Sequence, residues 1–172
     1  MNTIEAIRTR RSIRAFSRRT VEDSVIKEIL TDVGFAPSAG NLRSRDVIVV
    51  RNKETKIALA KAAFHQDFVE EADVVFVFCA NRKKAAPYGK RGTELYCVQD
   101  ADAAVMCALL SIHERGLGSV WVGAFDEKEV AMILKLPDYV TAIAILPVGY
   151  PKEEKEPHSP PALKEFVHEE RW

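Results

Sequence analysis

Several features that mark particular classes of protein are scarce or missing in this sequence of 172 residues. It has three cysteines (Cys79, Cys97 and Cys107) and no CxxC spacing, so we expect reduced thiols and no disulfide framework. The four histidines show no ligand-like pairing, which argues against a structural metal. There is no run of 18 apolar residues and no apolar segment after the first charges, so we expect a cytoplasmic protein that does not cross a membrane.

Net charge is also missing, because 25 lysines and arginines balance 25 aspartates and glutamates. A general nucleic-acid-binding protein usually carries a basic surplus, so we expect no nucleic-acid partner. With 47% hydrophobic and 29% charged residues, the chain has the composition of a globular protein. Its length suits one domain over residues 1–172.

Conventional catalytic motifs are missing as well. The sequence has no GxSxG motif, no cysteine–histidine pair with suitable spacing and no paired carboxylates placed for hydrolysis. Gly116 and Gly118 do not begin a dinucleotide-binding GxGxxG motif, because Trp121 stands where the third glycine is needed. Cationic and amide groups without an acid–base set favour a binding protein, or a cofactor that carries the chemistry itself.

Hydrophobic periodicity predicts helices and strands that intermix without regular strand–helix–strand units. A short first helix should begin with an Asn2–Glu5 capping box and turn Ile4 and Ile7 inward. The other expected elements are helices at 20–34 (with a Thr20–Asp23 box), 53–64, 95–115 and 126–136, strands at 46–51, 72–80 and 140–150, and a strand and turn at 119–125. This order with short connections predicts an α+β layered fold rather than a doubly wound sheet.

Two segments of this series carry further expectations. The apolar residues of helix 95–115 cover nearly every direction and many are small, so we expect it to pack in its own core and at a subunit interface. The polar, glycine-containing stretch 81–94 is expected to be a mobile loop and the local determinant of any substrate. Tyr88 lies in this stretch, although an exposed loop tyrosine without a role is the simpler interpretation.

The most unusual local feature is residues 7–20, which hold six arginines and no acid. Such a cluster could be a nucleic-acid arm, a targeting signal, a solvated helix face or a pocket for an anion. Arg10, Arg11 and Arg14 surround Ser12 near the end of the first helix, and guanidinium and hydroxyl groups suit phosphate oxygens. Arginines in a last helical turn also complement the helix dipole while facing water, so both interpretations stay open.

Two loops offer groups that could approach a ligand. Asn41 ends the segment APSAGN (36–41), and its carboxamide suits a heterocycle edge that alternates carbonyl and N–H groups; an ordinary Asx turn is the alternative. Gly123, in the segment GAFD, allows close backbone approach to a ligand, whereas Asp126 is expected to cap the next helix. An ordinary strand-to-helix turn explains the second loop equally well.

Taken together, six segments of the chain resemble the nitroreductase family of FMN-dependent oxidoreductases, in its short, single-domain branch. They occur in the family's order and span nearly the whole chain. The segments are RRSIRAF (10–16), APSAGN (36–41), VQDADAA (98–104), GLGSVWVGAF (116–125), LPVGYP (146–151) and FVHEERW (166–172). The resemblance implies an α+β fold with a mixed or antiparallel sheet between helices, and an intertwined homodimer with FMN at the subunit interface.

The resemblance also implies roles for individual residues. Arg10, Arg11 and Ser12 would hold the FMN phosphate and ribityl chain, and Arg14 would lie near the pyrimidine edge of the flavin. Residues of the APSAGN loop would meet the flavin ring from the opposite subunit: Pro37, Ser38, Ala39 and Asn41. Gly123 and Ala124 would place backbone N–H groups near flavin N5.

The implied activity is ping-pong transfer of hydride from NADH or NADPH, through flavin N5, to a small oxidant such as a nitroaromatic, quinone, enone or free flavin. No catalytic side chain is expected, because orientation supplies most of the rate. A flavin-binding carrier or sensor without turnover is the alternative, and a nucleic-acid module is a third. Family members often have Gln-Pro and an aromatic after the asparagine, where this chain has Arg43, Ser44 and Arg45. Which C-terminal basic residue, if any, completes the phosphate site stays open among Lys152, Lys155 and His158.

Overall fold

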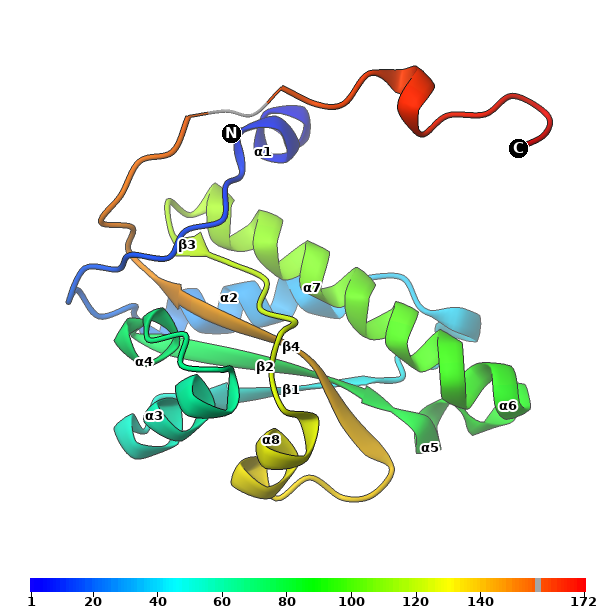
Figure 1. Ribbon diagram of the computed structural model, residues 1–172, viewed down its shortest axis with the longest axis horizontal. Helices are drawn as coiled ribbons and strands as arrows, with labels where there is room; N and C mark the ends of the chain where they lie inside the picture. The colour runs from blue at the N-terminus through cyan, green and yellow to red at the C-terminus, as the bar shows by residue number, and fades with distance from the viewer. Residues whose placement is uncertain (157–158) are drawn as a thin grey trace.

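A four-stranded antiparallel sheet runs through the centre of the protein, in the order β1-β2-β4-β3 (Figure 1). The computed structural model describes residues 1–156 and 159–172. The strands are β1 (Arg45–Val50), β2 (Val74–Asn81), β3 (Gly118–Ser119) and β4 (Val140–Gly149). Strands β2 and β4 lie in the middle and pair over eight residue positions, with one register shift after Phe78. The predicted α+β fold is confirmed.

Helices cover both faces of this sheet, which explains why the sequence of β2 is apolar without interruption. Val74, Phe76 and Phe78 pack toward α2 (Asp23–Gly34) and α7 (Cys97–Glu114). Residues Val75, Val77 and Cys79 pack toward the opposite layer, which consists of α3 (Lys53–Ala62), α4 (Phe68–Glu71) and α8 (Glu127–Leu134). Alternate residues of one strand therefore belong to two separate cores.

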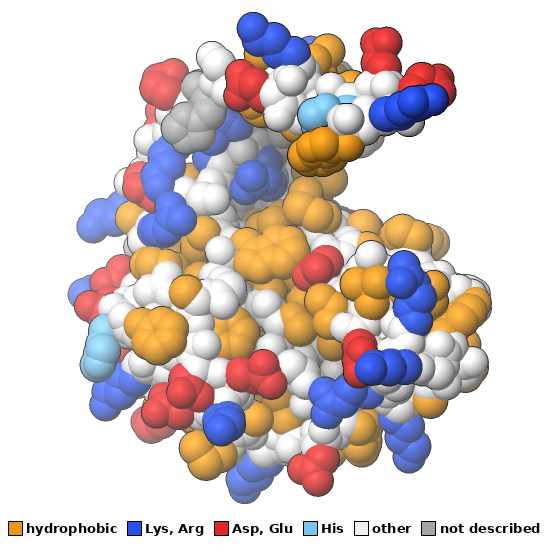
Figure 2. Space-filling view, turned by 45° about the vertical axis from the view of Figure 1, so that its right-hand side comes forward, with side chains coloured by type: hydrophobic (Ala, Val, Ile, Leu, Met, Phe, Trp, Pro, Cys, Tyr) orange, Lys and Arg blue, Asp and Glu red, His pale blue; other side chains and the backbone are white. Residues whose placement is uncertain are grey.

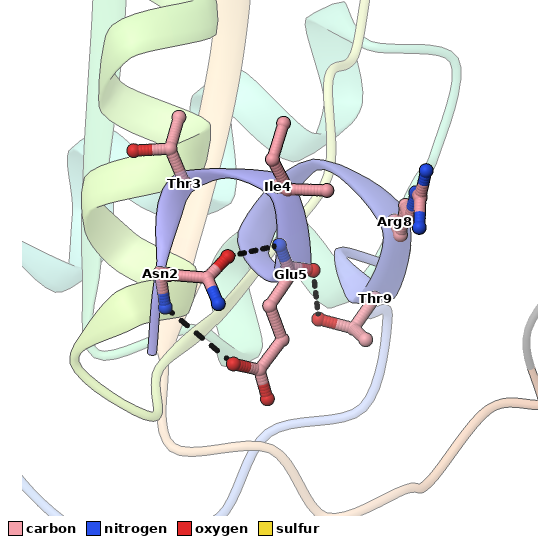
Figure 3. A pocket seen from close by; sticks show the side chains of 6 residues that line it. All are labelled: Asn2, Thr3, Ile4, Glu5, Arg8 and Thr9. Carbon is pink, nitrogen blue, oxygen red and sulfur yellow. Dashed lines mark hydrogen bonds between the residues drawn. The ribbon is translucent and has the colours of Figure 1, made fainter.

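The short first helix, α1 (Thr3–Thr9), has the predicted cap but not the predicted orientation. Glu5 N–H donates to Asn2 Oδ1 at 2.9 Å, and Asn2 N–H donates to Glu5 Oε2 at 3.4 Å (Figure 3). The expectation that Ile4 and Ile7 face inward is wrong, because each is 57% exposed. The helix spans only seven residues and buries Ala6 instead, so its apolar residues do not indicate its buried side.

One further local prediction, the Thr20–Asp23 box, is wrong. Helix α2 begins at Asp23 with Glu22 as the N-cap residue and no side-chain cap bond, so the Thr20 box does not form. Of the expected strand and turn at 119–125, Ser119 belongs to β3, and Val122 forms an isolated pair with Ile145. The remaining residues of that segment turn toward α8.

The stretch 81–94 is helical rather than a loop. It consists of α5 (Arg82–Ala85), a 3₁₀ turn η2 (Ala86–Tyr88), α6 (Gly89–Arg91) and a π-helical turn η3 (Gly92–Tyr96) that leads into α7. Asn81 Oδ1 caps the first turn by accepting from Lys84 N–H at 3.2 Å. Gly92 does not break the helix here; it allows close packing, since a methyl group at its Cα would overlap the carbonyl oxygen of Ala85.

Helix α7 is only half buried. The run Arg82–Glu114 is long and apolar enough to cross a membrane by length and composition, but it packs as a core helix and 50% of its most apolar window is buried. Ala101, Ala104 and Ala108 face the core, whereas Met106 is 43% exposed. An apolar side that its own chain leaves uncovered agrees with the predicted subunit interface, and the association itself stays a prediction.

Candidate flavin-binding site

The arginine-rich segment leaves α1 at Thr9 and then lies against the edge of the sheet. Ile13 N–H donates to Ser119 O at 3.0 Å, and Ser12 pairs with Ser119 in a parallel bridge. Ile13 and Phe16 are buried and anchor the segment. Gly118 is required for this contact, because a methyl group at its Cα would lie 2.7 Å from Ile13 Cγ2. Packing below the segment thus presents the arginines on its other side.

We expect Gly118→Ala to destabilise the protein by roughly 1–3 kcal/mol, the usual cost of overpacking a dense site. Ile13 would have to move, and Arg10, Arg11 and Ser12 would move with it, so FMN affinity should fall as well. Thermal unfolding and an FMN titration measure the two effects. Gly34→Ala is the matched control, because a methyl group there meets no atom within 4 Å. Equal effects from both variants would contradict this packing.

The predicted phosphate-binding residues gather around one hollow of about 800 Å³, lined by Arg10, Arg11, Ser12 and Arg14 together with Arg8 and Lys155. Figure 2 shows the molecule hollowed beneath the C-terminal tail, with basic side chains on the wall. Ser159, Pro160 and Pro161 of the tail complete the lining. The structure therefore brings together the three residues predicted to hold the phosphate and ribityl chain and Arg14, which is predicted to lie near the pyrimidine edge of the flavin.

The arginine charges of this hollow have no carboxylate beside them in the part of the chain that the structure describes. Within residues 1–156 and 159–172, no carboxylate lies within 4.0 Å of the guanidinium groups of Arg10, Arg11 or Arg14. Over the same described residues, Arg11 Nη2 is buried without a hydrogen-bond partner, whereas its Nη1 donates to the carbonyls of Arg8 (2.8 Å) and Arg10 (2.7 Å). Burial, and then the neighbouring Arg11, lower the pKa of Arg10. An oriented cationic donor without an acceptor is a group prepared for an anion.

Lys155 is the C-terminal basic residue that reaches this hollow. Its Nζ donates to Ser12 O at 2.8 Å and pairs with Glu153 Oε1 at 3.2 Å. Glu153 also accepts from Arg14 N–H at 2.6 Å, and this bond is the main reason that the pKa of its carboxyl lies below the ordinary value. Lys152 does not line the hollow, and His158 lies outside the described residues. The sequence could not select Lys155, which is 143 positions from Ser12.

The other arginines of the segment have separate surroundings. Arg18 and Arg19 are exposed, and the Arg19 guanidinium stacks 3.7 Å from the ring centroid of Tyr150. Neither of these two arginines lines the hollow. The six arginines therefore divide into a group around the hollow and a group outside it.

His113, at the end of α7, lies beside the same arginines. The Thr9 hydroxyl donates to Glu5 O at 2.7 Å, so His113 Nε2–H must be the donor in its 2.8 Å contact with Thr9 Oγ1. Burial is the largest cause that lowers the pKa of His113, and the positive charges of Arg10 and Arg11 lower it further. The negative charges of Glu114 and Glu5 have the opposite effect. The folded protein thus disfavours the protonated imidazole.

This pKa shift predicts a pH dependence of stability. A histidine whose pKa is lowered by folding contributes stability above its ordinary value of 6.5, and this contribution is lost as the pH falls through the folded value. We expect the melting temperature of the FMN-free protein to fall less in His113→Gln than in the wild type between about pH 7.5 and about pH 5.5. Parallel curves for the two proteins would show that His113 is not responsible.

The second predicted group, in the loop after α2, is held by a buried acid. The 3₁₀ turn η1 (Ala39–Asn41) includes two residues with left-handed backbone, Gly40 at φ 54° and Asn41 at φ 56°. Asp100 of α7 accepts from Ala39 N–H at 2.9 Å, from Ser44 N–H at 3.1 Å and from the Ser44 hydroxyl. One carboxylate therefore fixes both ends of the loop, and it leaves Asn41 exposed.

The two predicted groups lie at opposite ends of α7 (Figure 1). Thr9 contacts His113, whereas Ala39 contacts Asp100, and these two helix positions differ by 13 residues (113 − 100). At about 1.5 Å per residue, the contacts are roughly 20 Å apart. Arg11 and Asn41 therefore lie far apart within one chain. The predicted arrangement, in which they approach the flavin from two different subunits, requires this separation.

The third predicted group, Gly123 and Ala124, is exposed beside α3. Ala124 O accepts from Gln66 Nε2 at 3.0 Å, and Asp126 N–H donates to Ala62 O at 2.8 Å, which fixes the turn. Over the described part of the chain, the N–H groups of Gly123 and Ala124 donate to no protein acceptor. The predicted cap of α8 is confirmed, because Asp126 Oδ1 accepts from Glu129 N–H at 2.9 Å.

Comparison with known proteins agrees with this geometry. The family model described as the nitroreductase family matches residues 7–66 and 60–150. A Thermus thermophilus protein named NADH dehydrogenase is 35% identical, over 86% of this chain and 86% of its own length. A Bacillus subtilis protein named FMN reductase is 31% identical, over 91% of this chain and 70% of its own. The solved structure of NADPH:FMN oxidoreductase from Vibrio harveyi, complexed with NAD⁺, covers all of this chain and 78% of its own, with 26% identity and a TM-score of 0.91.

Proposed function

Because the chain belongs to the nitroreductase family, we propose that it is an FMN-dependent oxidoreductase that transfers hydride from NADH or NADPH to a small oxidant. The proposed oxidants are nitroaromatics, quinones, enones or free flavin, reduced in a ping-pong cycle. The proposed unit is a homodimer with one site at each end of its interface. FMN supplies the hydride-accepting and hydride-donating chemistry, and the protein supplies binding and orientation.

The residues around the N-terminal hollow fit the phosphate end of FMN. Arg11 Nη2 is a buried donor that finds no acceptor among the residues that the structure describes, and Arg10, Ser12 and Lys155 line the same hollow. Guanidinium donors match phosphate oxygens in geometry and charge. Arg10 and Arg11 would hold the phosphate, while Lys155 keeps Ser12 in place through its bond to the Ser12 carbonyl.

The other predicted site residues fit the flavin-ring end of FMN. Arg14 is exposed, with its guanidinium 5.9 Å from the ring centroid of Phe68, and would place a positive charge at the pyrimidine edge. The unused N–H groups of Gly123 and Ala124 would donate toward N5. Ser38 and Asn41 of the second copy would close the site from the other side. These fixed donors would stabilise negative charge without reorganising during the reaction.

The observation that carries this proposal is the buried Arg11 Nη2, which has no hydrogen-bond partner among the described residues and lies in a hollow where Arg10, Arg11 and Arg14 form no ion pair within those residues. The purified protein should bind FMN and show a flavin absorption spectrum. Anaerobic stopped-flow mixing with NADH and with NADPH should bleach that spectrum, and a nitroaromatic or quinone should restore it. A colourless protein that ignores added FMN would disprove the proposal, whereas a bound flavin that is never bleached would favour a carrier.

A further inference from the structure

Tyr88 lies directly against the loop that is proposed to meet the flavin ring. A methyl group at Gly40 would overlap the Tyr88 hydroxyl and lie 3.0 Å from Tyr88 Cε2. Gly40 is the centre of the η1 turn, between Ser38 and Asn41. The helical run that begins at residue 82 therefore brings an aromatic side chain to this loop, and 46% of Tyr88 is exposed. The exposed part of the Tyr88 side chain is accessible to a ligand that binds beside this loop.

The orientation of Tyr88 is fixed by its neighbours. The ring of Tyr96 packs edge-on against it, with centroids 5.4 Å apart and planes at 80°. Arg91 Nε in turn donates to the Tyr96 hydroxyl at 3.0 Å. Gly92 begins the π-helical turn that ends at Tyr96, and a methyl group at Gly92 would lie 2.8 Å from Tyr88 Cβ. π-helical turns inside helices are frequent at functional sites.

One arginine contacts the η1 loop, and another contacts the aromatic pair. Arg43 contacts Asn41 Oδ1 through its Nε at 3.3 Å, and Arg91 lies over Tyr96 at 5.4 Å from the ring centroid. Lys90 pairs with Glu94 at 3.9 Å, so these two charges compensate each other. In the parts of the chain that the structure describes, neither Arg43 nor Arg91 has a carboxylate within 4.0 Å. Two arginine charges therefore remain for a ligand.

We propose that Tyr88, Arg43 and Arg91 form a wall that selects planar, anionic oxidants, such as nitroaromatics or quinones that carry a carboxylate. The flat face of the oxidant would pack on Tyr88, and its anionic group would meet the guanidinium groups. This inference rests on the proposed function, because it needs Ser38 and Asn41 beside the flavin ring. Arg43 and Arg91 act here through charge and not through the hydride-transfer step.

Binding of a matched pair of ligands that cannot be reduced tests this wall. Benzoate and benzyl alcohol have similar shapes and differ in charge, and calorimetry measures their affinity for the oxidised, FMN-loaded protein. The double variant Arg43→Gln/Arg91→Gln should bind benzoate about 10-fold more weakly and benzyl alcohol within about twofold of the wild type. Tyr88→Ala should weaken both ligands to a similar degree, by roughly 2- to 10-fold.

Lys83→Gln is the matched control, because Lys83 is an exposed cation of the same helical run whose ammonium lies over Tyr139, 5.4 Å from the ring centroid. It should change neither affinity. In turnover, the ratio of kcat/KM for 4-nitrobenzoate to that for 4-nitrobenzyl alcohol should fall about 10-fold in the double variant.

Three results would overturn the inference: no benzoate binding to the wild type, unchanged benzoate affinity in the double variant, or equal loss from Lys83→Gln. Failure of the proposed function is recognised separately, because NADH and NADPH would then leave the flavin oxidised. A flavin that is bleached normally, with an unchanged substrate ratio, would overturn only the role of this wall.

Discussion

Arg11→Ala is expected to weaken FMN binding by roughly 10- to 100-fold, the range that corresponds to losing a hydrogen bond to a charged group. Arg11 is the residue whose buried Nη2 has no acceptor within residues 1–156 and 159–172, so the substitution removes a donor that we assign to the phosphate. The loss is measured by titrating the FMN-free protein with FMN and following the quenching of flavin fluorescence.

Two controls make this expectation specific. Arg18→Ala removes an equal charge from an exposed arginine of the same segment that does not line the hollow, and it should leave FMN affinity within about twofold. Riboflavin has the same ring and no phosphate, so Arg11→Ala should bind riboflavin as the wild type does. Equal FMN losses in both arginine variants, or an equal loss of riboflavin, would contradict the assignment of Arg11 to the phosphate.

Asp100→Ala is expected to have the largest effect on stability. Asp100 is 4% exposed and accepts from Ala39 N–H, Ser44 N–H and the Ser44 hydroxyl, so its removal leaves three donors without an acceptor. Breaking a buried charged network costs roughly 3–5 kcal/mol, which corresponds to a fall in melting temperature of about 10 °C for a chain of this size. Calorimetry of the FMN-free protein measures it.

A matched pair of isosteric variants separates the role of this carboxylate from general disturbance of α7. Asp100→Asn keeps one oxygen acceptor and should lose less stability than Asp100→Ala. Asp102→Asn makes the same chemical change two residues later, where burial raises the pKa of the carboxyl. Because the folded protein disfavours the Asp102 charge, that variant should keep the wild-type melting temperature or exceed it slightly. Similar losses from the two asparagine variants would contradict the loop-fixing role of Asp100.

The strands of the core could be predicted from the sequence because their signal is local and strong. Residues 74–80 are apolar throughout, and the structure buries β2 on both faces between helix layers. The stretch 81–94 could not be predicted, because glycine weakens a helix pattern whatever its purpose. The close contact between Gly92 and Ala85 is a tertiary fact that no periodicity reveals.

The candidate site, too, has a part that the sequence predicts and a part that only the folded structure reveals. The arginine-rich segment indicates an anion pocket through its composition, and the structure gathers Arg10, Arg11, Ser12 and Arg14 around one hollow. Lys155 and Asp100 act on these loops over 143 and 61 positions of sequence, so only the folded chain reveals them. The exposed side chains of Ile4 and Ile7 show that a seven-residue helix contains too few residues to define its buried face.

The most direct test of the central claim, that each FMN site is built from two copies of the chain, is FMN binding by mixed dimers. One variant carries Arg10→Ala and Arg11→Ala, and the other carries Ser38→Ala and Asn41→Ala. FMN is set at a concentration that neither variant binds alone. Mixed dimers would contain one site with all four residues intact, so co-refolding the two variants should restore flavin binding. If the four residues belonged to one subunit's site, every site in the mixture would stay defective, and no binding would return.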